Sequence, residues 1–346
     1  MAFDPNAAST PGSGAFGLPN TERDAAVVLL PVPFDATTSY GKGAANGPSA
    51  ILEASRQVDL FDLETGRPYA AGIFMLDESA DVRAWNQEAN AFSSRVIEAA
   101  GVVAGNPELE AALHKVNELS SRVNDFTHRE AARLIKDKKI VGLVGGDHAV
   151  PFGCIRAHAE AYPGLGVLHF DAHADLRPAY EGFAWSHASI MNNVVRECRV
   201  DKLVQVGIRD LSEEEHDQIE GSNGRIVGFY DVELKRAQRR GESWDSIATR
   251  IAESLPKEVY ISFDIDGLDP ALCPHTGTPV PGGLQFHEAT AILEAVARSG
   301  RTIVGFDLNE VSPGPDDDWD ANVGARMLYK LIGWTLVSRG LSQRRD

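Results

Sequence analysis

Cysteine, basic residues and long apolar runs are all scarce in this chain of 346 residues. Its three cysteines are too few and too scattered for a disulfide scaffold or a thiolate zinc site. No Lys or Arg precedes Arg23, and the apolar stretch 25–32 is too short to cross a bilayer. We therefore expect neither export nor membrane insertion, and a reducing, cytoplasmic location.

Acidic residues outnumber basic ones, with 50 Asp plus Glu against 33 Lys plus Arg and a formal net charge of −17. This charge disfavours nucleic acid and anionic membranes as partners, because both are polyanions. It suits a small cationic substrate, although acidity also serves solubility alone. Apolar residues make up 43% of the chain, which is enough for one large core or two ordinary ones.

Residues 1–24 are rich in Gly, Pro, Ser and Ala, which predicts a flexible N-terminal arm, either disordered or laid on a neighbouring subunit. Short apolar runs typical of strands follow at 26–32, 139–146, 165–173, 203–208, 225–231, 258–266 and 302–310. Their apolar residues are continuous and do not alternate with polar ones, which indicates strands covered on both faces in a parallel sheet.

The clearest helical stretch is 105–126, where Asn106 can cap and Pro107 suits the first helical position. Its apolar residues recur at spacings of three and four: Leu109, Leu113, Val116, Leu119, Val123 and Phe126. Strands that alternate with helices predict an α/β fold with three layers, αβα, around a mainly parallel central sheet. We find no repeat and no linker, so residues 25–346 are expected to form a single domain.

Four of the apolar runs end in side chains that commonly bind metal ions: Asp147 and His148; Asp171, His173 and Asp175; Asp264, Asp266 and Asp269; Asp307, Asn309 and Glu310. Ligands of such sheets bind outside the carboxyl ends of the strands. Each group alone has another explanation, such as a helix cap, a turn or a buried histidine. Four groups at the same end favour a metal centre, because buried carboxylates without compensation are costly.

Carboxylates mixed with imidazoles suit first-row divalent ions, and both Mn and Ni fit such a set. The number of carboxylates indicates two ions that share bridging ligands. A centre of two metal ions can activate water near neutral pH, so the chemistry predicted is hydrolysis.

The segments "GGDHAV", "FDAHADLR", "SFDIDGLDPALCPHTGTPVPGGL" and "FDLNEVSP" stand in this order. They resemble the ureohydrolase family of arginases, agmatinases and related guanidino hydrolases. "SYGKGAANGPSAILEAS" also resembles the N-terminal segment of that family. The resemblance implies an arginase-like fold and a hydrolase that cleaves a C–N bond of a linear amidine.

The resemblance further implies six ligands for two divalent ions: His148, Asp171, His173, Asp175, Asp264 and Asp266. Asp171 and Asp264 would bridge the two ions, and Asp171 would thereby take part in catalysis. His169 lies on the same strand face as Asp171 but one step deeper, and we interpret it as structural.

The remaining roles implied by the resemblance concern the substrate. Glu310 matches the carboxylate that pairs with the guanidinium. His187, in "AWSHAS", matches the histidine that moves a proton to the leaving amine, a role that needs a pKa near the working pH. Thr276 and Thr278, in "HTGTP", match the loop beside the guanidino pocket.

The substrate is less well defined by the sequence. Arg177 and Ser212 stand where arginases carry the Asn and Asp that hold the amino-acid end of arginine, so arginine is disfavoured. Trp185, beside His187, predicts a tight aromatic pocket for guanidine or a substituted biguanide such as metformin, giving urea or guanylurea plus ammonia or an amine. A packed Trp185 in a rim loop is the alternative, as is an agmatinase-type reaction that gives urea and a diamine.

Two other classes of protein are alternatives. A deacetylase of the same fold would need one zinc ion, and the set of six ligands with Glu310 disfavours it. A non-catalytic subunit would be expected to lack ligands, and none is missing. Because members of the family commonly form trimers or hexamers, we expect a homo-oligomer, with a hetero-oligomer that needs a related partner chain as the alternative.

Overall fold

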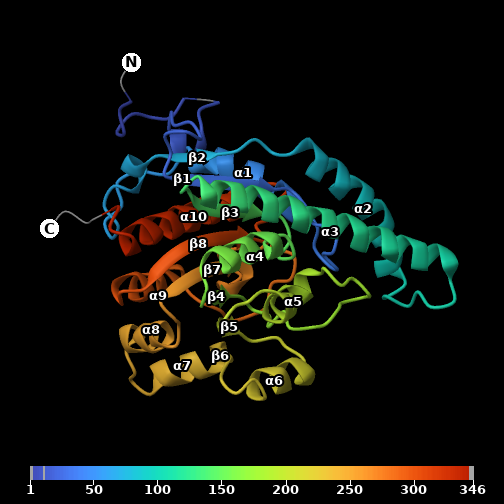
Figure 1. The fold of residues 1–346 in the computed structure, drawn as a ribbon. Coiled ribbons are helices and arrows are strands. Elements are labelled where there is room, and N and C mark those ends of the chain that lie inside the picture. Colours follow the sequence, from blue (N-terminus) through green and yellow to red (C-terminus); the bar gives the residue numbers. More distant parts are fainter. Residues whose placement is uncertain (1–2, 11, 343–346) are drawn as a thin grey trace.

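The computed structural model describes residues 3–10 and 12–342 of the chain. Its centre is one sheet of eight parallel strands in the order β2-β1-β3-β8-β7-β4-β5-β6 (Figure 1). The strands are β1 (Val27–Val32), β2 (Ile73–Met75), β3 (Ile140–Gly145), β4 (Gly166–Phe170), β5 (Lys202–Ile208), β6 (Ile226–Tyr230), β7 (Glu258–Asp264) and β8 (Thr302–Asn309).

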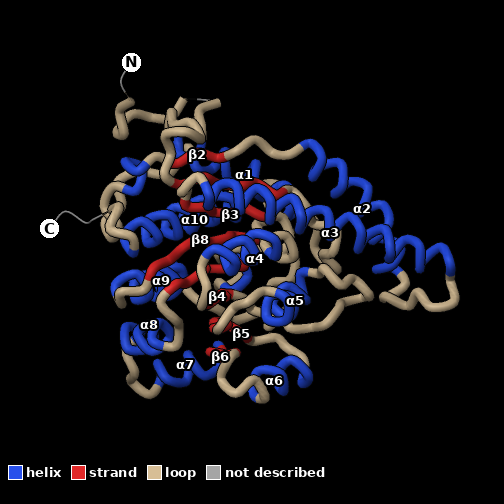
Figure 2. Tube along the Cα trace, viewed as in Figure 1, coloured by secondary structure: helices blue, strands red, loops and turns tan. Residues whose placement is uncertain are grey.

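Helices cover both faces of this sheet, as Figure 2 shows. They are α1 (Gly47–Ser55), α2 (Ala80–Glu98), α3 (Pro107–Lys136), α4 (Phe152–Ala161), α5 (Ile190–Glu197), α6 (Glu213–Glu220), α7 (Asp231–Arg239), α8 (Trp244–Glu253), α9 (Phe286–Arg298) and α10 (Trp319–Ser338). One apolar core joins the sheet to α1 and α7–α10, and a second joins it to α2–α6. The predicted three-layer α/β fold is therefore confirmed.

Each of the seven predicted apolar runs forms a strand. The short edge strand β2 was not predicted, because three residues are too few to show a pattern. The predicted helix is α3; its cap Asn106 accepts hydrogen bonds from the N–H groups of Glu108 and Leu109, and the helix continues to Lys136.

Part of the predicted N-terminal arm packs on the core of its own chain. Phe16 is buried, its ring centroid lies 4.9 Å from that of Tyr329, and its N–H donates to Ser55 Oγ. Residues 1, 2 and 11 of this segment lie outside the described residues. The flexibility of the arm and the domain boundary after residue 24 stay predictions.

All three cysteines, Cys154, Cys198 and Cys273, are free and buried. Within residues 3–10 and 12–342, no helix combines the length and the apolar character needed to span a membrane. The parallel strands place all their carboxyl ends at one edge of the sheet, where four neighbouring central strands, β3, β8, β7 and β4, end side by side. The predicted metal ligands follow these strands.

Candidate metal centre and active site

The sheet order brings together residues that lie far apart in the sequence. His148 follows β3, Asp171 follows β4 directly, Asp264 ends β7 and Glu310 follows β8 directly. All four side chains are buried. Neighbouring strands lie about 5 Å apart, so side chains at their ends converge on one small volume.

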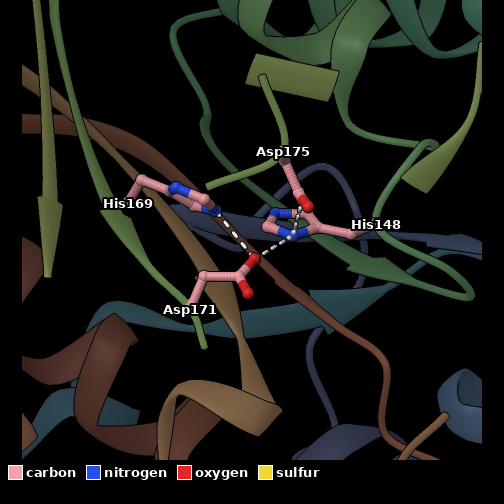
Figure 3. Close-up of side chains that lie close together, drawn as sticks. All are labelled: His148, His169, Asp171 and Asp175. Atoms are coloured by element: carbon pink, nitrogen blue, oxygen red, sulfur yellow. Dashed lines mark hydrogen bonds and ion pairs between the residues drawn. The ribbon is translucent and has the colours of Figure 1, made fainter. Parts of the chain in front are cut away.

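Three carboxylates face one nitrogen of His148. His148 Nδ1 lies 3.0 Å from Asp171 Oδ2, 3.4 Å from Asp175 Oδ2 and 3.2 Å from Asp264 Oδ2. Figure 3 shows His148, Asp171 and Asp175 pointing toward one another, with His169 on the other side of Asp171. These four residues form a group with the spacing of a metal site.

A second group shares Asp171. His173 Nδ1 lies 3.3 Å from Asp171 Oδ1 and 3.2 Å from Asp266 Oδ2, and these three residues also have the spacing of a metal site. Asp171 therefore turns one oxygen to each histidine, which is the geometry of a bridging carboxylate. Asp264 differs, because its Oδ1 accepts a hydrogen bond from the N–H of Asp266 and only Oδ2 faces His148.

The electrostatics show an excess of negative charge in this volume. Burial and the nearby Asp171 raise the pKa of Asp175 to about 7, and burial with Asp266 and Asp171 raises the pKa of Asp264 well above its usual value. Burial alone would lower the pKa of His173, but Asp266 and Asp171 raise it to about 12. Divalent cations among these oxygens would compensate the charge, so the donor set fits two such ions.

The other nitrogen of His148 is held by a buried chain of hydrogen bonds. His148 Nε2 lies 2.9 Å from Ser262 Oγ, which donates to Asp307 Oδ1 at 3.0 Å. Asn309 Nδ2 donates to the same Asp307 oxygen. Asp307 and Asn309, which end β8 and were candidate ligands, thus lie behind His148 and orient it, leaving Nδ1 for the carboxylates.

Two residues of the site adopt a strained backbone. Asp175 has φ 55° and Glu310 has φ 60°, in the left-handed region that residues other than glycine rarely occupy. Such strain costs on the order of 1 kcal/mol or more and is concentrated at functional sites. Its presence at a predicted ligand and at the predicted guanidinium partner supports a functional assignment of both.

Glu310 is buried and fixed on one side only. Its Oε1 accepts a hydrogen bond from the N–H of His148, whereas Oε2 has no partner among the described residues. Burial and the nearby Asp264 raise its pKa well above the usual value. Thr276 donates to the backbone carbonyl of Glu310, and Thr278 lies 3.4 Å from Asp266 Oδ2, so the predicted threonine loop touches both.

The side chains of His187 and Trp185 lie in different surroundings. His187 lines the cavity, with Nδ1 3.3 Å from Ser186 Oγ and 3.5 Å from Thr37 Oγ1. Burial and the nearby His173 lower the pKa of His187 to about 4, below the value near the working pH that the predicted proton-transfer role needs, so its imidazole is neutral at pH 7. Trp185 instead packs on Phe152, with ring centroids 4.9 Å apart, and does not belong to the cavity wall.

A cavity of about 520 Å³ opens above the second group and is lined by His173, Asp175, His187, Thr278, Tyr40, Tyr180, Arg177, Glu215 and Asp210, among others. Arg177 pairs with Glu215, at 3.5 Å, and its guanidinium lies over the ring of Tyr180. Asp210 forms no ion pair with any described residue. The sequence did not single out Tyr40, which is 85% exposed, because only the fold brings its loop to the cavity.

The fold has three layers, and a buried cluster of carboxylates and imidazoles lies at the carboxyl ends of the strands of its central sheet. This combination defines a metal-dependent hydrolase. A model of the arginase family matches residues 25–333, and the chain belongs to that family. It is accordingly a hydrolase of the C–N bonds of guanidino compounds. The family depends on a binuclear metal centre, and its members are typically oligomeric.

Named relatives match almost the whole chain. The N(1)-aminopropylagmatine ureohydrolase of Thermus thermophilus is 36% identical over 323 residues, which are 93% of this chain and 94% of that protein. The agmatinase of Halalkalibacterium halodurans is 29% identical over 321 residues, 91% and 94% of the two chains. The solved proclavaminate amidino hydrolase of Streptomyces clavuligerus shares the fold, with a TM-score of 0.73, 24% identity, and coverage of 96% of this chain and 99% of that one.

Proposed function

We propose that the chain hydrolyses a guanidino compound that carries a second cationic group, in an agmatinase-type reaction that yields urea and an amine. The observation that carries the proposal is Asp171, whose two oxygens face His148 and His173, and His173 lines the cavity. Two of the relatives named above favour this reading, because by their names one is an N(1)-aminopropylagmatine ureohydrolase and the other an agmatinase. They lend no support to guanidine or a biguanide as the substrate.

Six residues would hold two divalent ions, Mn or Ni, as the family resemblance implies: His148, Asp171, His173, Asp175, Asp264 and Asp266. When bound, such ions supply Lewis acidity, which activates a water molecule and stabilises negative charge as it develops. His148 and Asp175 belong to one side of Asp171, and His173 and Asp266 to the other.

The cavity wall suits a cationic substrate tail. Arg177 is the only Lys or Arg in the described wall, and it pairs with Glu215. Asp210, in the same wall, is left without an ion-pair partner among the described residues. Tyr40 offers an exposed aromatic ring at the same wall. A carboxylate and an aromatic face both attract an ammonium group.

The chain's own residues would act in order. Glu310 pairs with the guanidinium through its free Oε2, with the threonine loop holding Glu310 in place. Water adds to the guanidinium carbon to give a tetrahedral intermediate. Neutral His187 takes up a proton and delivers it to the leaving nitrogen, the C–N bond breaks, and urea and a protonated amine are formed.

The test is urea release by the purified protein loaded with Mn or with Ni. We expect agmatine or its aminopropyl derivative to be hydrolysed with a higher kcat/KM than arginine, guanidinobutyrate, guanidine or dimethylbiguanide. Preference for guanidine or dimethylbiguanide would overturn the substrate assignment. Full metal content and full activity in Asp264→Ala would overturn the site.

Asp210→Asn tests the tail contact within the same assay. It should raise KM for agmatine about tenfold or more, since a contact between opposite charges is lost. Guanidine, which has no tail, is the internal control, and any slow hydrolysis of it should be unchanged. An equal loss for both compounds would place Asp210 outside the tail contact.

We also propose that the chain forms a homo-oligomer, a trimer or hexamer, with a hetero-oligomer as the alternative. Oligomers are typical of the family. Light scattering of the purified protein should give a mass that is three or six times the chain mass of 37.4 kDa. A monomer that binds both metals but is inactive on every substrate would favour a missing partner chain.

A further inference from the structure

A row of polar residues crosses the buried sheet one step below the proposed ligands. In the register of the strands, Asp307 of β8 pairs with Ser262 of β7, Ser262 with His169 of β4, and His169 with Gln205 of β5. Their side chains are all 0% exposed. Polar groups in the interior of a sheet are costly and require hydrogen-bond partners, so their contacts indicate what they are for.

The orientation of Gln205 follows from one backbone carbonyl. Its side-chain nitrogen lies 2.7 Å from the carbonyl oxygen of Ala174 and donates to it. A flipped amide would set two carbonyl oxygens against each other, so the nitrogen must occupy this position. The same nitrogen lies 3.0 Å from His169 Nδ1, which must therefore accept the second hydrogen of the amide.

This contact determines which nitrogen of His169 carries the proton. A neutral imidazole has one N–H and one acceptor nitrogen. Since Nδ1 accepts from Gln205, the proton is on Nε2, which lies 2.9 Å from Asp171 Oδ2 and donates to it (Figure 3). Neither nitrogen of His169 is then free to bind a metal ion, although His169 lies as close to His148 and Asp175 as the ligands of one metal ion would.

We infer that His169 and Gln205 are positioning residues of the metal centre: Gln205 holds His169 in its Nε2–H form, and His169 fixes the bridging carboxylate of Asp171. The other oxygen of Asp171 accepts from the backbone N–H of His173 at 2.6 Å. Each oxygen thus has one fixed donor, which sets the plane of the carboxylate between the two groups. The inference rests on the proposed metal centre at Asp171.

The first experiment measures metal binding to the metal-free full chain by calorimetry with Mn²⁺. His169→Phe keeps the bulk but removes the donor, and we expect both dissociation constants to rise, by about 10- to 100-fold. His169→Gln, whose amide can still donate, should lose less than His169→Phe. Thr335→Val, which removes a buried hydroxyl on α10, is the matched control and should bind as the unaltered chain does.

The outcomes separate the possible failures. Unchanged affinity in His169→Phe would overturn the inference, as would the loss of one equivalent of Mn²⁺ with the other bound normally, since His169 would then be a ligand. If the unaltered chain binds neither Mn²⁺ nor Ni²⁺, the proposed metal centre fails and the inference fails with it.

The second experiment begins with the unaltered chain, so its first readout does not depend on the folding of a variant. Nitrogen NMR of histidine-labelled, metal-free protein distinguishes the two neutral forms of an imidazole directly. We expect His169 to carry its proton on Nε2, whereas a proton on Nδ1 would overturn the inference. In Gln205→Leu the Nε2–H form should no longer be the only one observed, and Mn²⁺ affinity should fall without a change in the number of ions bound.

Discussion

At the scale of single residues, Gly267 controls the space beside Asp171. A Cβ atom added to Gly267 would lie 2.7 Å from the backbone nitrogen of Asp171, which cannot move aside as a flexible side chain would. Gly267→Ala should therefore lower the free energy of unfolding by about 1–3 kcal/mol. It should also weaken Mn²⁺ binding, because the bridging carboxylate shifts. Denaturant unfolding and metal titration measure the two effects, and a variant unchanged in both would contradict this packing.

His158, away from the metal centre, predicts the response of stability to acid. It packs on Tyr260, its Nδ1 donates to the carbonyl of Cys154, and burial lowers its pKa from 6.5 to about 4. The folded state thus binds a proton at His158 less readily than the unfolded state does. Its contribution to stability is complete above pH 6.5 and is lost as the pH falls toward 4, at a cost of about 3 kcal/mol.

The measurement is the free energy of unfolding of metal-free protein between pH 7 and pH 4. His158→Gln should be less stable at pH 7 but should lose less stability on acidification than the unaltered chain. The same slope in both proteins would show that His158 does not titrate in this range.

Residue types and spacing sufficed to predict the ligand candidates, because each follows an apolar strand that the pattern reveals. The pairing of Gln205 with His169, and of Ser262 with His148, depends on strand order and register, which the sequence does not contain. The only indication of a polar role for Gln205 in the sequence was that it stands alone in the apolar run "LVQVGI". The direction of Trp185, which packs on Phe152, likewise depends on a loop path that no periodicity specifies.

At the scale of elements, the N-terminus of α6 is tied to the loop that follows Asp175. Glu215 and Ser212 form a capping box, and Glu215 Oε1 also accepts from the N–H of Leu176. Glu215→Ala removes the box and leaves the Leu176 N–H without its partner, so stability should fall by about 1–2 kcal/mol. Hydrogen exchange should become faster at Leu176 and in α6. Glu215→Gln is the control and should retain most of the protection.

Elements with a strong local signal were predictable. The start of α3 follows from Asn106 and Pro107, and the long strands follow from their apolar runs. The weak edge strand β2 has no such signal, and its pairing with β1 alone defines it. The short helix at Ala15–Gly17 was missed for a similar reason, since burial of Phe16 against α10 outweighs the local excess of Gly and Pro.

At the scale of the whole molecule, metal binding and folding are linked. Burial, together with repulsion from neighbouring carboxylates, raises the pKa values of Asp175 and Asp264. A bound cation relieves both costs in the folded state, where the carboxylates are assembled, and so stabilises that state. Mn²⁺ at about 1,000 times its dissociation constant should add about 4 kcal/mol. The thermal midpoint of the metal-free chain should rise by several degrees on addition of Mn²⁺. Asp264→Asn should show little or no rise, and a full rise would contradict the assigned site.

The position of β8 has a consequence for biosynthesis. It is the last strand to be translated, yet it lies in the middle of the sheet, between β3 and β7. Until residues 302–309 have left the ribosome, the nascent chain holds two separate half-sheets, each with an unpaired inner edge of the kind that promotes aggregation. The insertion of this late strand closes both edges, joins the two half-sheets and brings Glu310 against the backbone N–H of His148. A chain that stops before Thr302 should therefore aggregate and bind no Mn²⁺.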